Sequence, residues 1–220
     1  MILTKMKVGT RLSLGFALVL VLLVLVTALG ILRMSQIQDR LERVVDVSNV
    51  ESRLVLDMRS IVYDRMVSLR NLTLLNDADD MEKELRLIAE QSKKYAAFES
   101  QLSKMFATEP NTTKDERDLL LKLKENEAAS APLVEKAKAL GLANQPEQAT
   151  ITLIKKIRPV QKKWLDVLDE MVVLEDKLNK GLADEARSEF QVARTTMLVI
   201  VVAALLLGAG AAYAITHSIL

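Results

Sequence analysis

Three arginines and a tyrosine stand close together in the first half of the chain, at Arg59, Tyr63, Arg65 and Arg70. Arg65 follows Met58 by seven residues, which places it on the apolar face of a helix. An unpaired guanidinium buried there is costly, so Arg65 must reach solvent, pair with an acid or meet an anion. Guanidinium groups hold carboxylates through two parallel hydrogen bonds. These residues therefore predict a carboxylate-binding site.

A second polar group, made of Arg158, Gln161 and Lys162, is expected at the same height of the fold on another helix. Pro159 lies among these residues and has no backbone N–H, so one helical carbonyl nearby loses its donor. Counting inward from the turns brings the two groups to the same region. The predicted ligand-binding residues are Arg59, Tyr63, Arg65, Arg70, Arg158, Gln161 and Lys162.

The arginines also have a simpler explanation, in which they are solvated and form ion pairs. The acids available for such pairs are Asp57, Asp64 and Glu170. Both explanations stay open for Arg59 and Arg70, whereas the apolar setting of Arg65 favours a role with a ligand or at an interface. Two large aromatic residues, Tyr95 and Trp164, are expected to belong to the core.

Composition excludes several kinds of chemistry. The chain has no cysteine, hence neither disulfides nor thiolate metal sites. Its single histidine, His217, lies near the C-terminal end, so a histidine-based metal centre or catalytic triad cannot form in the middle of the chain. The acids Asp77, Asp79 and Asp80 are typical of a helix start, with Asp77 as the cap. We expect no metal, no cofactor and no enzymatic activity, and a net charge of +1 gives no reason to expect nucleic acid.

Two apolar stretches bracket the polar middle of the chain. Residues 12–32 and residues 195–216 contain no charged side chain. Each stretch has about 20 residues, enough for a helix to cross about 30 Å of hydrocarbon. The first is longer than the apolar core of a signal peptide, which has about 7–15 residues. The sequence thus predicts two membrane-spanning helices in contact with the lipid bilayer.

The charged residues before the first stretch predict the orientation. Lys5, Lys7 and Arg11 are not accompanied by an acid, and positive flanks stay in the cytoplasm. We therefore expect both termini on the cytoplasmic side of the cell inner membrane and the middle segment in the periplasm. The expected segments are a cytoplasmic N-terminus (1–11), a first transmembrane helix (12–33), an extracytoplasmic domain (34–194), a second transmembrane helix (195–216) and the start of a cytoplasmic linker (217–220).

The middle segment is expected to form four helices joined by short turns. They cover residues 34–76, 79–107, 113–140 and 146–194, and the last one continues into the second span. Thr113 and Glu116 form a capping-box pattern, and Gly141 is expected to end the third helix. The predicted fold class is all-α, an up-down-up-down four-helix bundle between two transmembrane helices.

Apolar residues recur at helical spacing in this segment and indicate the core. In the first helix they are Leu54, Met58, Ile61, Leu69 and Leu72. In the second they include Leu85, Ile88, Ala89, Leu102 and Phe106. In the fourth, steps of four and three alternate through Leu153, Ile157, Val160, Trp164, Val167, Met171, Leu174 and Leu178. Such a register favours packing against neighbouring helices, including those of a second subunit.

The order of these parts resembles a known family. The basic leader Met6-Lys7-Val8-Gly9-Thr10-Arg11, the two spans, the four-helix segment and Ile215-Thr216-His217-Ser218-Ile219 are similar to the sensor half of methyl-accepting chemotaxis proteins. Asp64-Arg65-Met66-Val67-Ser68-Leu69-Arg70-Asn71 resembles the end of the first bundle helix in that family. The resemblance implies a homodimeric receptor that binds an anionic metabolite, a dicarboxylate or amino acid, at the dimer interface and transmits a helix shift through the second span.

In that family a cytoplasmic linker and a signalling coiled coil follow the second span. The sequence stops at Leu220, where such a linker would begin. We therefore expect the chain to be truncated, with its contact to a cytoplasmic kinase complex made only by the missing half. Related bundles also belong to histidine kinases and cyclic-dinucleotide enzymes. A binding protein is a further partner that the resemblance allows. The alternative function is an interaction module that responds to a partner protein and has no small-molecule site.

Overall fold

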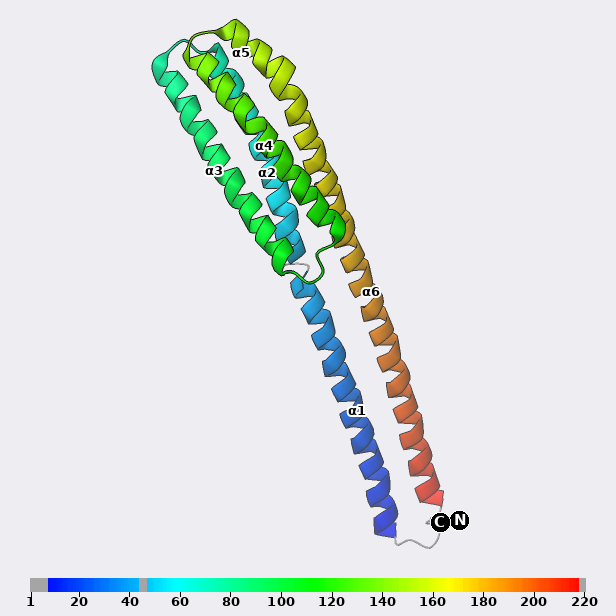
Figure 1. Cartoon of the computed structure of the whole chain (residues 1–220). Coiled ribbons are helices and arrows are strands. Elements are labelled where there is room, and N and C mark those ends of the chain that lie inside the picture. The colour runs from blue at the N-terminus through cyan, green and yellow to red at the C-terminus, as the bar shows by residue number, and fades with distance from the viewer. Residues whose placement is uncertain (1–7, 44–46, 218–220) are drawn as a thin grey trace. The chain divides into compact units, whose positions relative to one another are not determined.

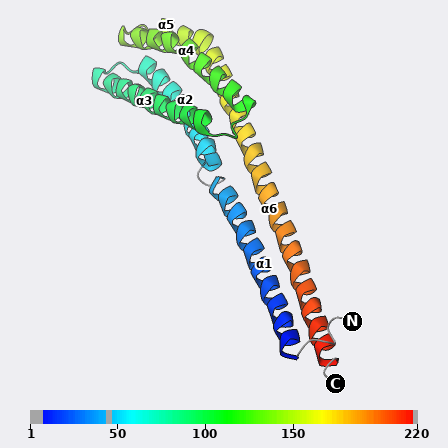
Figure 2. The same cartoon turned by 60° about the horizontal axis from the view of Figure 1, so that its bottom comes forward.

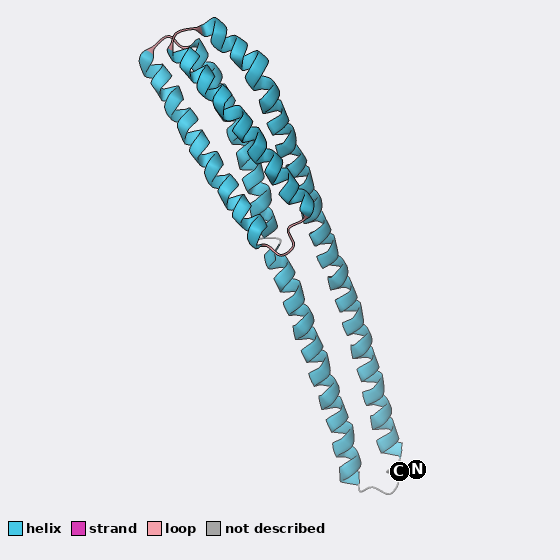
Figure 3. Ribbon diagram, in the orientation of Figure 1, coloured by secondary structure: helices cyan, strands magenta, loops and turns pink. Residues whose placement is uncertain are grey.

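The computed structural model describes residues 8–43 and 47–217, and helices account for nearly all of them (Figure 3). No strand occurs within those ranges, so the all-α prediction is confirmed. Contacts between residues divide the chain into two compact units. One unit is Val45–Lys180, and the other combines Met1–Val44 with Gly181–Leu220.

The unit Val45–Lys180 is a four-helix bundle. Successive helices run in alternating directions and are joined by short turns, so the expected up-down-up-down order is confirmed (Figure 1). The fourth position of the bundle is shared by two helices and a π turn between them. The elements are α2 (Asn49–Leu74), α3 (Ala78–Thr108), α4 (Lys114–Leu142), α5 (Pro146–Thr152), the π turn η3 (Leu153–Ile157) and the first part of α6 (Arg158–His217).

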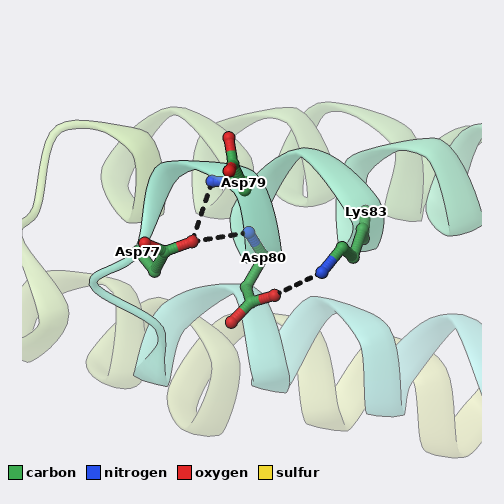
Figure 4. A network of polar contacts seen from close by, with 4 residues as sticks. All are labelled: Asp77, Asp79, Asp80 and Lys83. Carbon is green, nitrogen blue, oxygen red and sulfur yellow. Dashed lines mark hydrogen bonds and ion pairs between the residues drawn. The ribbon is translucent and has the colours of Figure 1, made fainter.

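Two helices begin at caps that the sequence predicted. The Asp77 carboxylate accepts hydrogen bonds from the backbone N–H groups of Asp79 and Asp80, both at 3.0 Å (Figure 4). The Thr113 side chain accepts from the Glu116 N–H, and the Glu116 carboxylate accepts from the Thr113 N–H. These bonds satisfy donors that the first turn of a helix leaves without partners, and they fix where α3 and α4 begin.

The predicted end of the third helix is wrong in detail. Gly141 lies inside α4, which continues to Leu142, and Asn144 instead adopts the left-handed conformation with φ 51°. Gly141 packs against α2, where an added Cβ would meet the Leu72 carbonyl oxygen at 3.3 Å. The glycine therefore serves close helix packing and does not act as a cap. In α3, Ala89 is exposed and not part of the core, contrary to expectation.

The bundle core consists of two apolar clusters. Along α2, Leu54 to Val62 contribute to one cluster, and Leu69 and Leu72 contribute to the other. Arg65 and Ser68, both buried, lie between these two runs. A polar layer thus interrupts the apolar core. The expected α6 residues Trp164 and Met171 are buried, and so are Leu168 and Glu175, which the sequence analysis did not include.

The sequence predicted one regular helix at the fourth bundle position. This prediction is wrong, because a π turn separates α5 from α6. In this turn the Arg158 N–H donates to the Leu153 carbonyl oxygen. Pro159 follows immediately and has no N–H to continue an α-helical ladder. Wide turns of this kind accommodate an irregular ladder and are frequent at functional sites.

The second unit holds the apolar helix α1 (Val8–Arg43) and the C-terminal part of α6, which lie side by side (Figures 1 and 2). A Cβ on Gly30 would approach the Met197 methyl group to 3.0 Å, so these helices are tightly packed at Gly30. Two helices of the described chain are long and apolar enough to cross a membrane, in the ranges Gly15–Asp39 and Pro146–Gly210.

Some expectations fall wholly or partly outside what the structure describes, among them the linker start, because residues 218–220 are not described. Lys5 and Lys7 precede the described residues, and nothing is described of the Arg11 side chain. A single helix over 34–76 also remains a prediction, because α1 ends at Arg43, α2 begins at Asn49 and residues 44–46 are not described.

Candidate functional site

A groove of about 850 Å³ lies between α2 and the π-turn region of the fourth bundle position. Five of the seven residues predicted to bind a ligand line it, from two segments far apart in the sequence: Tyr63, Arg70, Arg158, Gln161 and Lys162. Thr73, Leu74, Thr150, Leu153, Ile154, Pro159 and Leu165 are among the other lining residues. The structure therefore brings the two predicted groups together in one groove.

Positive charge on this groove comes from both walls. Arg70 belongs to α2, whereas Arg158 and Lys162 belong to α6, and all three are exposed. The Lys162 ammonium group lies 2.7 Å from an Asp166 carboxylate oxygen. Within the described ranges neither arginine makes an ion pair. Two guanidinium groups facing a shared space are suited to a carboxylate, because each can offer paired N–H donors.

The remaining wall of the groove is apolar. Leu74 and Ile154 are exposed, and they extend the surface next to Arg70 and Arg158. Exposed apolar side chains beside the two arginines favour a ligand that has both a carboxylate and an apolar body. The sequence analysis missed Leu74 and Ile154, although both lie four residues from a predicted arginine.

Gln161 connects the groove to the interior of the bundle. Its Nε2 donates to the Val62 backbone carbonyl oxygen at 3.3 Å and so joins α6 to α2. The same residue also lines a small cavity of about 20 Å³, together with Arg65, Ser130 and Trp164. Gln161 therefore connects the groove to the surroundings of the buried Arg65 side chain.

Arg65 is not among the groove residues, in contrast to the predicted set. It is 8% exposed, and its guanidinium carbon lies 4.7 Å from the Trp164 ring centroid and 6.0 Å from that of Tyr95. Guanidinium groups stack favourably on aromatic rings, more so where water is excluded. Trp164 and Tyr95 are both buried, as predicted, and the indole N–H donates to the Tyr95 hydroxyl at 2.9 Å.

One acidic side chain, Glu127, partly compensates the charge of the buried guanidinium. Burial lowers the pKa of Arg65, and the negative charge of Glu127 raises it again. Burial raises the pKa of Glu127 to about 7, aided by its hydrogen bond with the Glu99 carboxyl and by the charge of Glu99, while Arg65 acts in the opposite direction. Arg65 is thus held within the bundle by two aromatic rings and the nearby charge of Glu127.

Arg59 also lies outside the groove, and it makes the ion pair that the simpler explanation expected. Its Nε lies 2.5 Å from an Asp169 carboxylate oxygen, and its guanidinium carbon lies 5.7 Å from the Tyr63 ring centroid. The acid is Asp169 rather than any of the acids expected from the sequence, because helix-to-helix pairing depends on the rotation of α6. Arg59 therefore links α2 to α6 beside the groove.

The comparison with protein families agrees with this architecture. Residues 5–190 match the family described as a four-helix bundle sensory module for signal transduction. The chain therefore belongs to this family of sensory modules. That membership is consistent with the sensor region of a methyl-accepting chemotaxis receptor, as the sequence predicted. No curated protein matches the chain.

Proposed function

We propose that this chain is the sensor region of a transmembrane chemoreceptor and that the groove beside the π turn binds a small carboxylate. The observation that carries the proposal is the convergence of Arg70, Arg158 and Lys162 on one groove. A short dicarboxylate can use both arginines, and an amino acid with an apolar side chain can contact the cations and the apolar wall together.

Signal transmission is proposed to run along α6. This helix begins at Arg158 in the groove and continues to His217 through the second apolar stretch. A ligand that binds one of two arrangements of the π-turn region more tightly would shift the population toward it. Shifts of about 1–2 Å along a helix are typical of such signals.

A homodimer is part of the proposal, and a second stripe on α2 supports it. Leu56, Tyr63, Val67 and Leu74 are all exposed, and they follow one another at steps of seven, four and seven residues. This spacing is that of a coiled-coil seam, which buries such a stripe against a second helix. Two of the four residues, Tyr63 and Leu74, also line the groove, so a second subunit would lie beside the ligand.

The proposed orientation places both termini in the cytoplasm, with the bundle in the periplasm of a cell with two membranes. The basic residues at the N-terminal flank support it, because positive flanks stay on the cytoplasmic side. A cytoplasmic output domain of a chemoreceptor, a histidine kinase or a cyclic-dinucleotide enzyme would receive the signal.

The ligand site can be tested by thermal unfolding of the full chain in detergent against dicarboxylates, amino acids and aromatic acids. A ligand at about 100 times its Kd stabilises the folded state by about 2.7 kcal/mol, which raises the midpoint by several degrees. Arg158→Ala and Arg70→Ala should abolish the rise. Arg53→Ala, at an exposed arginine on α2 beside Asp57, is the matched control and should keep it.

A second candidate function, a module that responds to a partner protein, is favoured by the exposed α2 stripe. The stripe could bind another protein instead of a second copy. No midpoint shift with any compound in a folded chain would support this second function.

Because the chain lacks cysteine, Val67→Cys offers a clean test of the dimer. Crosslinking at Val67 but not at the exposed control Leu121→Cys would support the homodimer.

A further inference from the structure

Three glutamates from three helices meet inside the bundle, far along α6 from the groove. They are Glu51 near the start of α2, Glu116 near the start of α4 and Glu175 on α6. One carboxylate oxygen from each lies within 4.8 Å of those of the other two. All three residues are buried, with exposed fractions of 5%, 4% and 1%. The described chain thus concentrates three acids where charge is expensive to bury.

The hydrogen bonds of this acid cluster are incomplete. Glu116 is engaged in the capping box, where its carboxylate accepts from the Thr113 N–H. In contrast, Glu175 Oε1 is fully buried and has no hydrogen-bond partner within the described part of the chain. A buried carboxylate oxygen without a donor leaves its desolvation cost uncompensated. The Glu175 carboxylate lies close to the other two acids, and no donor of the described residues compensates its buried oxygen.

The charges that act on the pKa values of Glu51 and Glu175 all come from acids, and no base among the described residues acts on either pKa. Burial raises the pKa of Glu51 to about 7 and that of Glu175 to about 8, and the charges of neighbouring acids contribute to both increases. Glu116 acts on both carboxyls, and Glu109 acts on Glu51. This environment differs from that of Arg65, where an opposite charge is present.

We propose that Glu51, Glu116 and Glu175 form a binding site for a hard divalent cation, with Ca²⁺ as the preferred ion. Carboxylate oxygens are the ligands that such cations prefer, and soft metals lack thiolate or imidazole ligands here. Ca²⁺ binds oxygens at about 2.3–2.6 Å, so two of its ligands can be as much as about 4.6–5.2 Å apart. Mg²⁺, with bonds of about 2.0–2.1 Å, requires a tighter set than this spacing provides.

The proposed cation site lies at the end of the bundle where α6 leaves it, away from the groove. Glu175 lies five residues before Lys180, where the bundle unit ends, and Glu51 lies six residues after its start at Val45. A cation held there would join α6 to α2 and α4 just before the chain leaves the bundle. The cation would therefore restrain the same helix that is proposed to carry the signal.

The test uses the full chain in detergent after treatment with a chelator, and the probes are Ca²⁺, Mg²⁺ and Mn²⁺. We expect Ca²⁺ at about 100 times its Kd to raise the unfolding midpoint by about 5 °C or more, with a smaller rise for Mg²⁺. Calorimetric titration should give about one Ca²⁺ per chain, with release of protons, because carboxylates must lose theirs to bind.

Two variants remove the ligands without removing much volume. Glu175→Gln and Glu51→Gln should each weaken Ca²⁺ binding at least tenfold, whereas Glu170→Gln, at an exposed site on α6, should leave it unchanged. Circular dichroism verifies that each variant is folded. The proposal is overturned if the wild-type midpoint is the same with and without every cation. Equal Ca²⁺ affinity in wild type and in a folded Glu175→Gln variant would overturn it too, because binding would then lie elsewhere.

Discussion

The bundle buries charge at two levels, and the two differ in how that charge is compensated. Arg65 stacks on Trp164 and Tyr95 and has Glu127 as an opposite charge. Glu51, Glu116 and Glu175 meet with no base among the described groups that influence the pKa values of Glu51 and Glu175. The arginine layer, formed by Arg65, Trp164, Tyr95 and Glu127, therefore contains charges of both signs, whereas the acid cluster contains acids alone. The acid cluster is the level where a cation from solution can supply the missing opposite charge.

The largest effect is expected from removing the aromatic support of the arginine layer. Trp164→Ala should destabilise the bundle by about 3–5 kcal/mol, since it deletes a large buried ring. It also leaves the Tyr95 hydroxyl without its donor and Arg65 without its stacking partner. Chemical denaturation of the full chain measures this change. Val173→Ala, at an exposed site on the same helix, should change stability by less than about 0.5 kcal/mol.

A pair of matched variants tests the comparison directly. With a chelator present at about pH 8, Glu175→Leu should stabilise the bundle by about 1–4 kcal/mol, because an uncompensated buried acid is replaced by an apolar group. Arg65→Leu should instead destabilise it by about 1–3 kcal/mol, since stacking and the interaction with Glu127 are lost. Effects of the same sign in both variants would mean that the two levels are not different in kind.

The cap of α3 should not distinguish the two levels, because it lies at the surface. Asp77→Ala should cost about 1 kcal/mol, through loss of the two hydrogen bonds to the first turn of α3 (Figure 4). Asp79→Ala is the matched control, because only its backbone N–H takes part in the cap. A loss at Asp79 as large as at Asp77 would show that charge in the first turn, and not the cap, stabilises α3.

The smallest effect is a change in pH dependence at the arginine layer. The pKa of Glu127 is raised from 4.5 to about 7, so its contribution to stability is present below pH 4.5 and is lost as the pH rises through 7. Glu99 and Arg65 act on the pKa of Glu127, and the charge of Glu127 in turn raises the pKa of Tyr95. Glu127→Gln should reduce the fall in unfolding midpoint over this range.

Matched variants isolate that pH effect. The contributions of Glu51 and Glu175 to stability are lost over an overlapping pH range, in wild type and variant alike. The difference between the two curves of midpoint against pH therefore reports on Glu127. Glu125→Gln, at an exposed site on α4, should leave the curve unchanged. A Glu127→Gln curve parallel to that of the wild type would contradict the assignment.

Much of this protein was predictable from local sequence. Apolar periodicity identified the four helices and the two long apolar stretches, since helical spacing alone decides which side chains share a face. The caps at Asp77 and Thr113 were equally predictable, because a cap involves residues within one turn. Five of the predicted ligand residues proved to line one groove for a related reason, since regular helices fix their height along the bundle.

The rest depended on contacts between helices. The sequence could place Arg65 on the apolar face, but only packing decided that it faces Trp164 and not the groove. It showed Pro159 but not the π turn before it, because a missing N–H does not decide which local geometry accommodates the irregular ladder. Glu51, Glu116 and Glu175 each lie at helical spacing from buried apolar residues on their own helix. This spacing could have predicted from the sequence that each of them is buried. That they meet within 4.8 Å was decided by the tertiary structure, because relative helix rotation and height bring together residues from separate helices.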